Sequence, residues 1–445
     1  MKQKLQSILL DFMGKENDGL SSKLAGNAFG TFSLKILGTG LSFLLSIVLA
    51  RALGGSGGYG IYAYGTAWLT LLSVPTKLGM ERLMVRKASG YKATGNWGML
   101  KGLLYKSIQY VSTAGISVAL IMTAVFYVVA PDEDKRMIIW LALIGLPFLS
   151  LRATFVSALR GLNRVWLSQI PAVILYPGLI LLSVLVVELT GVDLTPNLAI
   201  LINVSSIVCS LILAIVMLRR FLPVKLRDYR SEYDLSDWVR VGIPMLLIAT
   251  LQNMHRKLGV LMLGAYGTDE MVGVFAVCNR GTELINFPLM AINLALAPVI
   301  AGMYAKGQMG KMQKILHKAA KATLIGSVPI TIGLMALSSV YLILFGKDFL
   351  TGQTALLILC CGQLMNVFMG SVGVVLGMTK HERFMVFAAS IGLVVNLVLS
   401  FTLIPTYGLE GAAIATAAST VSWNLIMLYG VFRFVGVNPT IFAKP

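Results

Sequence analysis

The chain has 445 residues, of which 57% are hydrophobic and 13% are charged, and its mean hydropathy is +0.80. This composition excludes a soluble globular protein and indicates an integral membrane protein. The formal net charge of +18 is distributed by loop and forms no single basic face, so no nucleic acid partner is expected.

The N-terminal segment 1–26 is predicted to lie at the cytoplasmic surface of the membrane. Leu5, Ile8, Leu9 and Phe12 recur at helical spacing between lysines, a pattern typical of an interfacial helix. Its apolar core is too short for a signal peptide, and no small-residue cleavage site follows it.

Apolar segments long enough to cross a bilayer recur along the chain. About 20 apolar residues in a helix span the hydrocarbon core. We therefore predict an all-α polytopic membrane protein with about twelve transmembrane helices. The apolar windows are 27–50, 58–80, 104–130, 137–158, 165–187, 198–218, 238–266, 271–301, 320–345, 350–377, 383–405 and 409–432.

Lysine and arginine in the loops fall mainly on one side of these helices. The N-terminus and the loops after every second helix hold most of them, and the opposite loops hold only Arg51, Lys135, Arg136 and Lys347. Because cytoplasmic loops carry the excess of basic residues, both termini are predicted to be cytoplasmic.

A charged connection, residues 219–237, separates the predicted helices into two groups of six. Halves with an even number of helices run in the same sense, as parallel repeats about an axis along the membrane normal. We predict a lobe at 27–218, a cytoplasmic linker at 219–237, a second lobe at 238–432 and a cytoplasmic tail at 433–445. The two six-helix repeats would enclose a central cationic cleft.

Pro75 and Pro288 are the predicted hinges. They coincide at an offset of 213 residues, in the second helix of each half. A proline inside a helix removes a backbone hydrogen bond and permits a kink. Rocking of the lobes about the cleft would then give alternating access, and a static kink is the alternative.

The first predicted helix carries a polar stripe that runs from Thr31 through Lys35 to Ser46. Lys35 lies about eight residues inside this helix and is predicted to face the cleft, with extension to the cytoplasm as the alternative. Lys77 and Arg152 lie nearer the cytoplasmic ends of their helices. Their side chains are expected to extend to the cytoplasm.

The seventh predicted helix carries polar and charged residues where membrane helices rarely do. Gln252, Asn253, His255, Arg256 and Lys257 cover one broad face of it. A cation near mid-bilayer costs about 2.5–3.5 kcal/mol on insertion scales, so these residues are predicted to face a bundle interior or a wet cavity. The alternative is that the cations reach the interface or serve packing alone.

The eighth predicted helix repeats this pattern after a turn at Thr268, with Asn279, Arg280 and Glu283. Arg256 and Arg280 lie equally far from Thr268 along the chain, so an antiparallel hairpin would place them at similar depth. Arg280 and Glu283 are three residues apart and are predicted to pair. Glu283 is either this charge partner or the group that binds a coupling proton.

Cations outnumber carboxylates in the predicted membrane interior, where Glu283 is the one carboxylate. A cavity with this positive charge suits an anionic ligand. The predicted substrate-binding residues are Lys35, Gln252, Asn253, Arg256, Lys257, Asn279 and Arg280.

The sequence carries no catalytic or nucleotide-binding signature. Its Gly-Lys pairs lack the P-loop pattern, and its three histidines lack metal-ligand spacing. An enzyme that polymerises or ligates glycans would need an outer loop to hold its sugars, and the outer loops have only about five to ten residues. We therefore expect no enzyme activity, no cofactor and no metal site.

Short motifs are spread over nearly the whole chain. They are Ala50-Arg51-Ala52-Leu53-Gly54, Tyr59-Gly60-Ile61-Tyr62, Val260-Leu261-Met262-Leu263-Gly264, Val272-Gly273-Val274-Phe275 and Leu403-Ile404-Pro405-Thr406-Tyr407-Gly408-Leu409-Glu410-Gly411-Ala412-Ala413. In this order they resemble the polysaccharide flippase family of the multidrug, oligosaccharidyl-lipid and polysaccharide exporter (MOP) superfamily.

The resemblance implies a transporter that moves a polyprenyl-diphosphate-linked oligosaccharide across the bacterial inner membrane, as in O-antigen or capsule assembly. The implied partners are this lipid-linked diphosphate, membrane lipid, a coupling ion (H+ or Na+) and a glycan polymerase complex. Arginine and lysine suit a diphosphate anion. Relatives often carry an acidic residue where this chain has Gly259, so a cation-coupling site of that kind would lack its acid.

Two alternative functions remain open. A drug or cation antiporter of the same superfamily would need buried carboxylates, which the predicted helix cores of the N-terminal half lack. A membrane-embedded glycan polymerase or ligase is disfavoured by the short outer loops.

Overall fold

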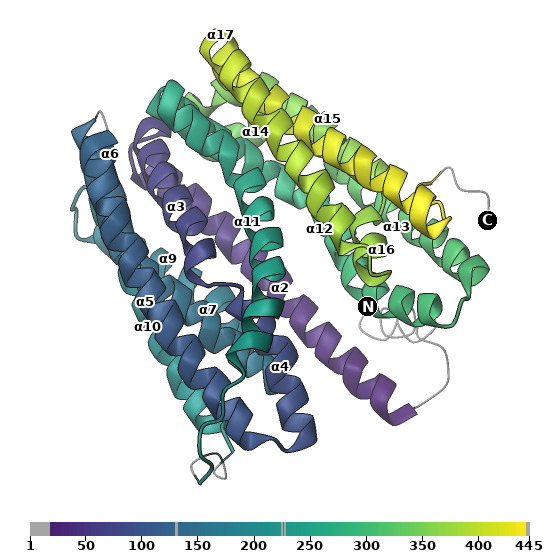
Figure 1. The fold of residues 1–445 in the computed structure, drawn as a ribbon. Coiled ribbons are helices and arrows are strands. Elements are labelled where there is room, and N and C mark those ends of the chain that lie inside the picture. The colour runs from purple at the N-terminus through teal and green to yellow at the C-terminus, as the bar shows by residue number, and fades with distance from the viewer. Residues whose placement is uncertain (1–17, 130–131, 224–225, 227, 442–445) are drawn as a thin grey trace. The chain divides into compact units, whose positions relative to one another are not determined.

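The computed structural model describes residues 18–129, 132–223, 226 and 228–441, and it is helical almost throughout (Figure 1). Within these ranges there is no strand, and nine stretches are long and apolar enough to cross a membrane. The predicted all-α polytopic membrane fold is confirmed. The apolar positions of the predicted N-terminal interfacial helix lie outside the described residues.

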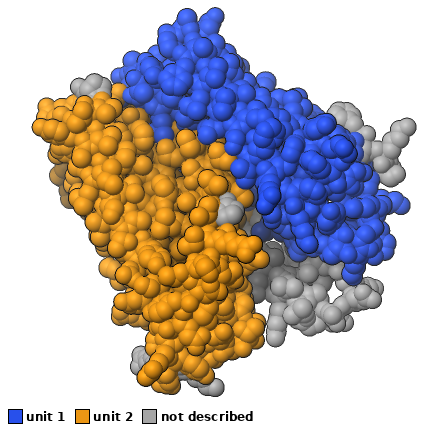
Figure 2. All heavy atoms as spheres, in the orientation of Figure 1, with its two compact units in different colours: residues 1–29, 258–445 blue, residues 30–257 orange. Residues whose placement is uncertain are grey.

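The structure divides into two compact units, which Figure 2 shows in different colours. Unit 2 comprises residues 30–257, and unit 1 comprises residues 1–29 and 258–445. The division falls inside the helix Leu235–Tyr266. The lobe boundaries drawn from the sequence stay a prediction.

In unit 2, α6 (Glu133–Ile144) and α10 (Pro196–Phe221) start at short polar residues that cap them. Asp132 accepts a hydrogen bond from the backbone N–H of Asp134, 3.2 Å, at the start of α6, and Thr195 caps α10 in the same way. Its elements are α2 (Asp18–Ala52) from residue 30 onward, α3 (Ser56–Thr76), α4 (Met80–Thr94), α5 (Trp97–Val129), α6 (Glu133–Ile144), α7 (Leu146–Gly161), α8 (Val165–Gln169), the π-helical turn η1 (Ile170–Leu175), α9 (Tyr176–Leu189), α10 (Pro196–Phe221) and the first part of α11 (Leu235–Tyr266).

Besides residues 18–29 of α2, unit 1 comprises the end of α11, the tight turn predicted at Thr268 and the elements that follow it. The Thr268 hydroxyl accepts a hydrogen bond from the backbone N–H of Met271, 3.4 Å, and so caps the next helix. The further elements are α12 (Asp269–Ala305), α13 (Met309–Ala336), α14 (Ser338–Ile343), the 3-10 turn η3 (Lys347–Gly352), α15 (Gln353–Met369), α16 (Val372–Met378), α17 (Glu382–Gly430) and the π-helical turn η4 (Val431–Val435).

The last two predicted helices, 383–405 and 409–432, meet at a kink within α17. The kink lies at Gly408, whose backbone has φ 51° and ψ −119°. Glycine adopts this conformation without strain because it has no Cβ. Gly408 therefore determines where one helix ends and the next begins.

The connection between α10 and α11 is fastened to unit 2. We call residues 228–238 the strap. The backbone N–H of Glu232 donates to the carbonyl of Gly98, 3.0 Å, and Lys101 Nζ donates to the carbonyl of Tyr229, 2.8 Å. Both contacts tie the strap to α5.

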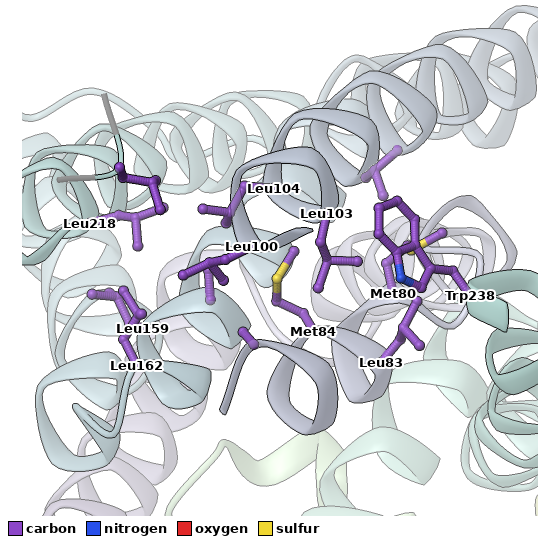
Figure 3. Packing of buried hydrophobic residues seen from close by; sticks show 14 residues of the cluster. Met80, Leu83, Met84, Leu100, Leu103, Leu104, Leu159, Leu162, Leu218 and Trp238 are labelled. Atoms are coloured by element: carbon purple, nitrogen blue, oxygen red, sulfur yellow. The ribbon is translucent and has the colours of Figure 1, made fainter. Parts of the chain in front are cut away.

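The strap ends in the hydrophobic core of unit 2. Trp238 is 1% exposed and packs in one cluster with Met80, Met84 and Leu103 (Figure 3). Its indole N–H donates to the Tyr91 hydroxyl, 3.0 Å, so the one polar atom of the ring is satisfied. The core therefore includes a side chain from beyond α10.

Gly102 lets the strap approach α5. A Cβ at this position would collide with the Glu232 backbone carbonyl. Gly102→Ala is therefore expected to displace the strap and to lower the stability of the protein by about 1–3 kcal/mol, as overpacking does. Thermal unfolding of the purified protein in detergent measures the change.

The matched control is Gly90→Ala in α4, where an added Cβ meets no atom within 4 Å. Alanine in an open helix position is expected to stabilise slightly, by about 0.5–1 kcal/mol. Equal unfolding temperatures for the two variants would contradict the close approach of the strap.

Candidate functional site

The polar face of α11 lies in unit 2 and is hydrogen-bonded. Arg256 Nη2 donates to Asn253 Oδ1, 2.9 Å, one turn earlier on the same helix. Arg82 of α4 donates to Gln252 Oε1, 3.3 Å. Arg256 is exposed and Lys257 is half-buried. The structure thus brings the predicted residues of α11 together with a cation from α4.

Lys35 also lies in unit 2, half-buried on α2. The positive charge of Arg160 on α7 repels the ammonium group of Lys35. Sequence reasoning missed Arg160, because the residue lies beyond the predicted helix 137–158, among the cations of the following loop.

Lys77 and Arg152 make contacts with neighbouring groups, and their predicted extension to the cytoplasm stays a prediction. Lys77 pairs with Glu81, 3.4 Å, and its side chain is only 17% exposed. The Arg152 guanidinium lies over the Tyr176 ring, 4.6 Å from its centroid, and its Nη1 is buried. Contacts with neighbouring elements hold both side chains inside unit 2.

The predicted ion pair on α12 is confirmed in unit 1. Arg280 Nη1 lies 2.8 Å from Glu283 Oε2, with 31% of the arginine and 59% of the glutamate side chain exposed. Asn279 is half-buried beside them, and its backbone carbonyl accepts a hydrogen bond from the Thr282 hydroxyl. The pair is local to one helical turn.

One turn further along α12 lies an amide cluster that the sequence did not indicate as a group. Asn366 Nδ2 of α15 donates to Asn286 Oδ1, 3.0 Å, and to Gln363 Oε1, 3.3 Å. The three-residue spacing of Gln363 and Asn366 was a usable signal, since it places both on one face of a helix. The cluster extends the polar surface of α12 onto α15.

The two predicted hinge prolines differ in setting. Pro288 lies inside α12, and Gly326 of α13 packs against its ring, where an added Cβ would lie 2.9 Å from the Pro288 Cβ. The Ser327 hydroxyl donates to the Ile285 carbonyl, 2.9 Å, beside this position. Pro75 is exposed, one residue before the end of α3. Hinge motion at either proline stays a prediction.

The predicted site residues thus fall into two groups. Unit 2 holds Lys35, Gln252, Asn253, Arg256 and Lys257, and unit 1 holds Asn279, Arg280 and Glu283. The similar depth expected for Arg256 and Arg280 stays a prediction.

Comparison with known proteins identifies the family. The family described as "Polysaccharide biosynthesis protein" matches residues 24–304, more than half of the chain. The chain belongs to this family. The family described as MatE matches residues 244–402. The resemblance to the polysaccharide flippases of the MOP superfamily is therefore confirmed.

Relatives of this chain include the probable low-salt glycan biosynthesis flippase Agl15 of Haloferax volcanii. It is 22% identical over 180 residues, which cover 40% of this chain and 38% of Agl15. A second, the probable flippase AglR of the same organism, is 23% identical over 230 residues, 48% of this chain and 45% of AglR. The chain matches less than half the length of these curated relatives.

Solved structures share the fold over almost the whole chain. An inward-facing multidrug resistance MATE family transporter of the MOP superfamily superposes with a TM-score of 0.72 at 16% identity, covering 92% of this chain and 98% of that structure. At identities this low, the likeness shows the fold alone.

Gly259 has a packing role in this fold. A Cβ at residue 259 would lie 2.5 Å from Phe275 Cε1 and 3.2 Å from Thr416 Oγ1. Phe275 is fully buried. A side chain at residue 259 would therefore require Phe275 to move.

We expect Gly259→Ala to lower stability by about 1–3 kcal/mol, because the methyl group overlaps the Phe275 ring. Phe275→Leu in the same chain should relieve the overlap and recover part of the loss. Thermal unfolding in detergent compares both variants with Gly333→Ala, an open helical position in the same unit. A Gly259→Ala variant that unfolds at the same temperature as the wild type would contradict the close packing.

The Arg280 and Glu283 pair is expected to show coupling in a double-mutant cycle. Arg280→Met or Glu283→Gln alone leaves one charge without its partner, whereas the double variant leaves neither. We expect a coupling energy of about 0.5–1 kcal/mol between the two side chains. Unfolding of the four proteins measures it, and additive losses would show that the pair stabilises nothing.

Proposed function

We propose that the protein flips a polyprenyl-diphosphate-linked oligosaccharide from the cytoplasmic to the outer leaflet of a bacterial inner membrane, for surface polysaccharide assembly. It would act as a transporter and not as an enzyme, by alternating access of two lobes. The observation that carries the proposal is the set of cations on α11 and α12 in a chain of the polysaccharide biosynthesis family. Two curated relatives named as probable flippases support it.

The chemistry of the substrate fits these side chains. A diphosphate presents several anionic oxygens, and an arginine donates two parallel hydrogen bonds to such a group. Each charge-assisted bond contributes about 1.5–3 kcal/mol. Arg256, Lys257, Arg280 and Lys35 would hold the diphosphate, with Gln252, Asn253 and Asn279 adding neutral donors and acceptors. The lipid tail would stay in the bilayer while the sugars cross.

The proposal also covers the orientation of the protein in the membrane, the ion gradient that drives transport and the partners. Both termini would be cytoplasmic, as the distribution of basic loops indicates. A proton or sodium gradient would drive transport, and Glu283 would serve mainly as the charge partner of Arg280, which it contacts at 2.8 Å. Membrane lipid and a glycan polymerase complex would be partners.

The second candidate is a drug or cation antiporter, which the MatE match over residues 244–402 favours. A cationic substrate needs carboxylates inside the membrane region. On α12 the described carboxylate at the site, Glu283, is already paired with Arg280. The charge of the site therefore favours an anionic substrate over a cationic one.

Alanine at the two arginines tests the function. Arg256→Ala or Arg280→Ala should lower glycan export at least tenfold at unchanged protein level, since a loss of 1.4 kcal/mol is already a factor of about ten. Lysine at either position should retain part of the activity, because charge survives but the two-pronged geometry does not. Complementation of a flippase-null strain, scored as surface glycan per membrane protein, measures the effect.

Arg240→Ala is the matched control, because Arg240 is an exposed arginine of α11 outside the proposed site. It should export as the wild type does. Full export by the Arg256→Ala, Arg280→Ala double variant would overturn the proposed grip on the diphosphate.

A further inference from the structure

Two arginines of α7 are held inside unit 2 with donors that have no acceptor. Arg152 Nη1 and Arg160 Nε are both buried, and neither has a hydrogen-bond partner among the described residues. A buried donor without an acceptor costs about 1–3 kcal/mol, and more when the group is charged. These atoms therefore indicate an acceptor that the protein itself does not supply.

The Tyr176 ring stabilises Arg152 only in part. The guanidinium lies 4.6 Å from the ring centroid, which gives a favourable cation–π contact with its face. A cation–π contact supplies no hydrogen-bond acceptor, so Arg152 Nη1 still lacks one among the described residues. This nitrogen is thus available to a ligand.

Other charges near the arginines are mostly positive. Glu81 is the carboxylate that attracts both Arg152 and Arg160, and it already pairs with Lys77 at 3.4 Å. Lys35 adds a further cation, repelled by Arg160. The cluster therefore keeps an excess of positive charge in a region from which water is largely excluded.

Helix packing brings these elements together. Gly38, one turn after Lys35 on α2, approaches the π-helical turn η1 so closely that an added Cβ would lie 2.9 Å from the Val173 carbonyl. This contact places α2 beside η1, the turn that leads into α9 and Tyr176. Single π-helical turns inside helices occur frequently at functional sites.

We propose that Lys35, Arg152, Arg160 and Tyr176 form an anion site within unit 2 that binds a phosphate group. The fork of Arg152 and the Nε of Arg160 would donate to phosphate oxygens, and Lys35 would add charge. The phosphate could belong to a lipid headgroup or to a free phosphate anion. The site stands on these contacts alone, although Lys35 also belongs to the proposed transport site.

Binding is tested on the purified protein, without any transport step. Thermal unfolding is followed in neutral detergent with sodium pyrophosphate against sodium chloride at equal ionic strength. A second arm compares nanodiscs of phosphatidylglycerol with nanodiscs of phosphatidylcholine. We expect stabilisation by pyrophosphate, by phosphatidylglycerol or by both, and the responding arm identifies the source of the phosphate.

Variants locate the site. In the double variant Arg152→Met, Arg160→Met, the ligand concentration required for the same stabilisation should rise at least tenfold. Arg160→Lys should weaken the stabilisation by ligand less, because lysine keeps the positive charge. This variant is measured instead if the double variant does not fold. Arg86→Met, an exposed arginine of α4 in the same unit, should respond as the wild type does.

Two results would overturn the proposal. One is a wild-type protein that unfolds at the same temperature with and without phosphate in both arms. The other is a response that the α7 variants share in full with the wild type, because the anion would then bind elsewhere. Export by Arg256 and Arg280 variants is scored separately, so failure of the transport proposal leaves this binding result intact.

Discussion

The cost of placing a charge where water is excluded is the constraint on which this structure depends. Two cations of the described helices show how a contact on a neighbouring turn or an adjoining helix offsets part of this cost. Arg280 meets Glu283 within one turn of α12, and Arg152 lies over the Tyr176 ring at the start of α9. Such contacts fix the rotation of each helix about its axis, because a charged side chain turned toward lipid would lose its partner.

The sequence predicted what depends on local pattern. Helices follow from long apolar windows, and the Arg280 and Glu283 pair follows from a spacing of three residues. It did not predict the contact between Arg152 and Tyr176, because Tyr176 lies on another helix and its position does not follow from local spacing. It also missed the close approach of Gly259 to Phe275, which depends on how α11 and α12 fold back on each other.

The shared fold and the distinct polar interior follow from different parts of the sequence. Apolar patterning and small residues at close approaches determine how helices pack, and many sequences satisfy both, as a TM-score of 0.72 at 16% identity shows. In the proposed function, a few charged positions determine which ligand is favoured. Gly259 shows how the two are linked, because any side chain at this position would overlap the buried Phe275 ring.

Trp238 has a consequence for synthesis of the protein on the ribosome. The core between α4, α5 and α7 includes this indole, which follows α10 in the chain by more than a dozen residues. The described elements up to α10 therefore leave the ribosome and enter the membrane with a gap in their core. That core closes only when the beginning of α11 has been translated, so a nascent chain paused after α10 would expose apolar surface to chaperones and proteases.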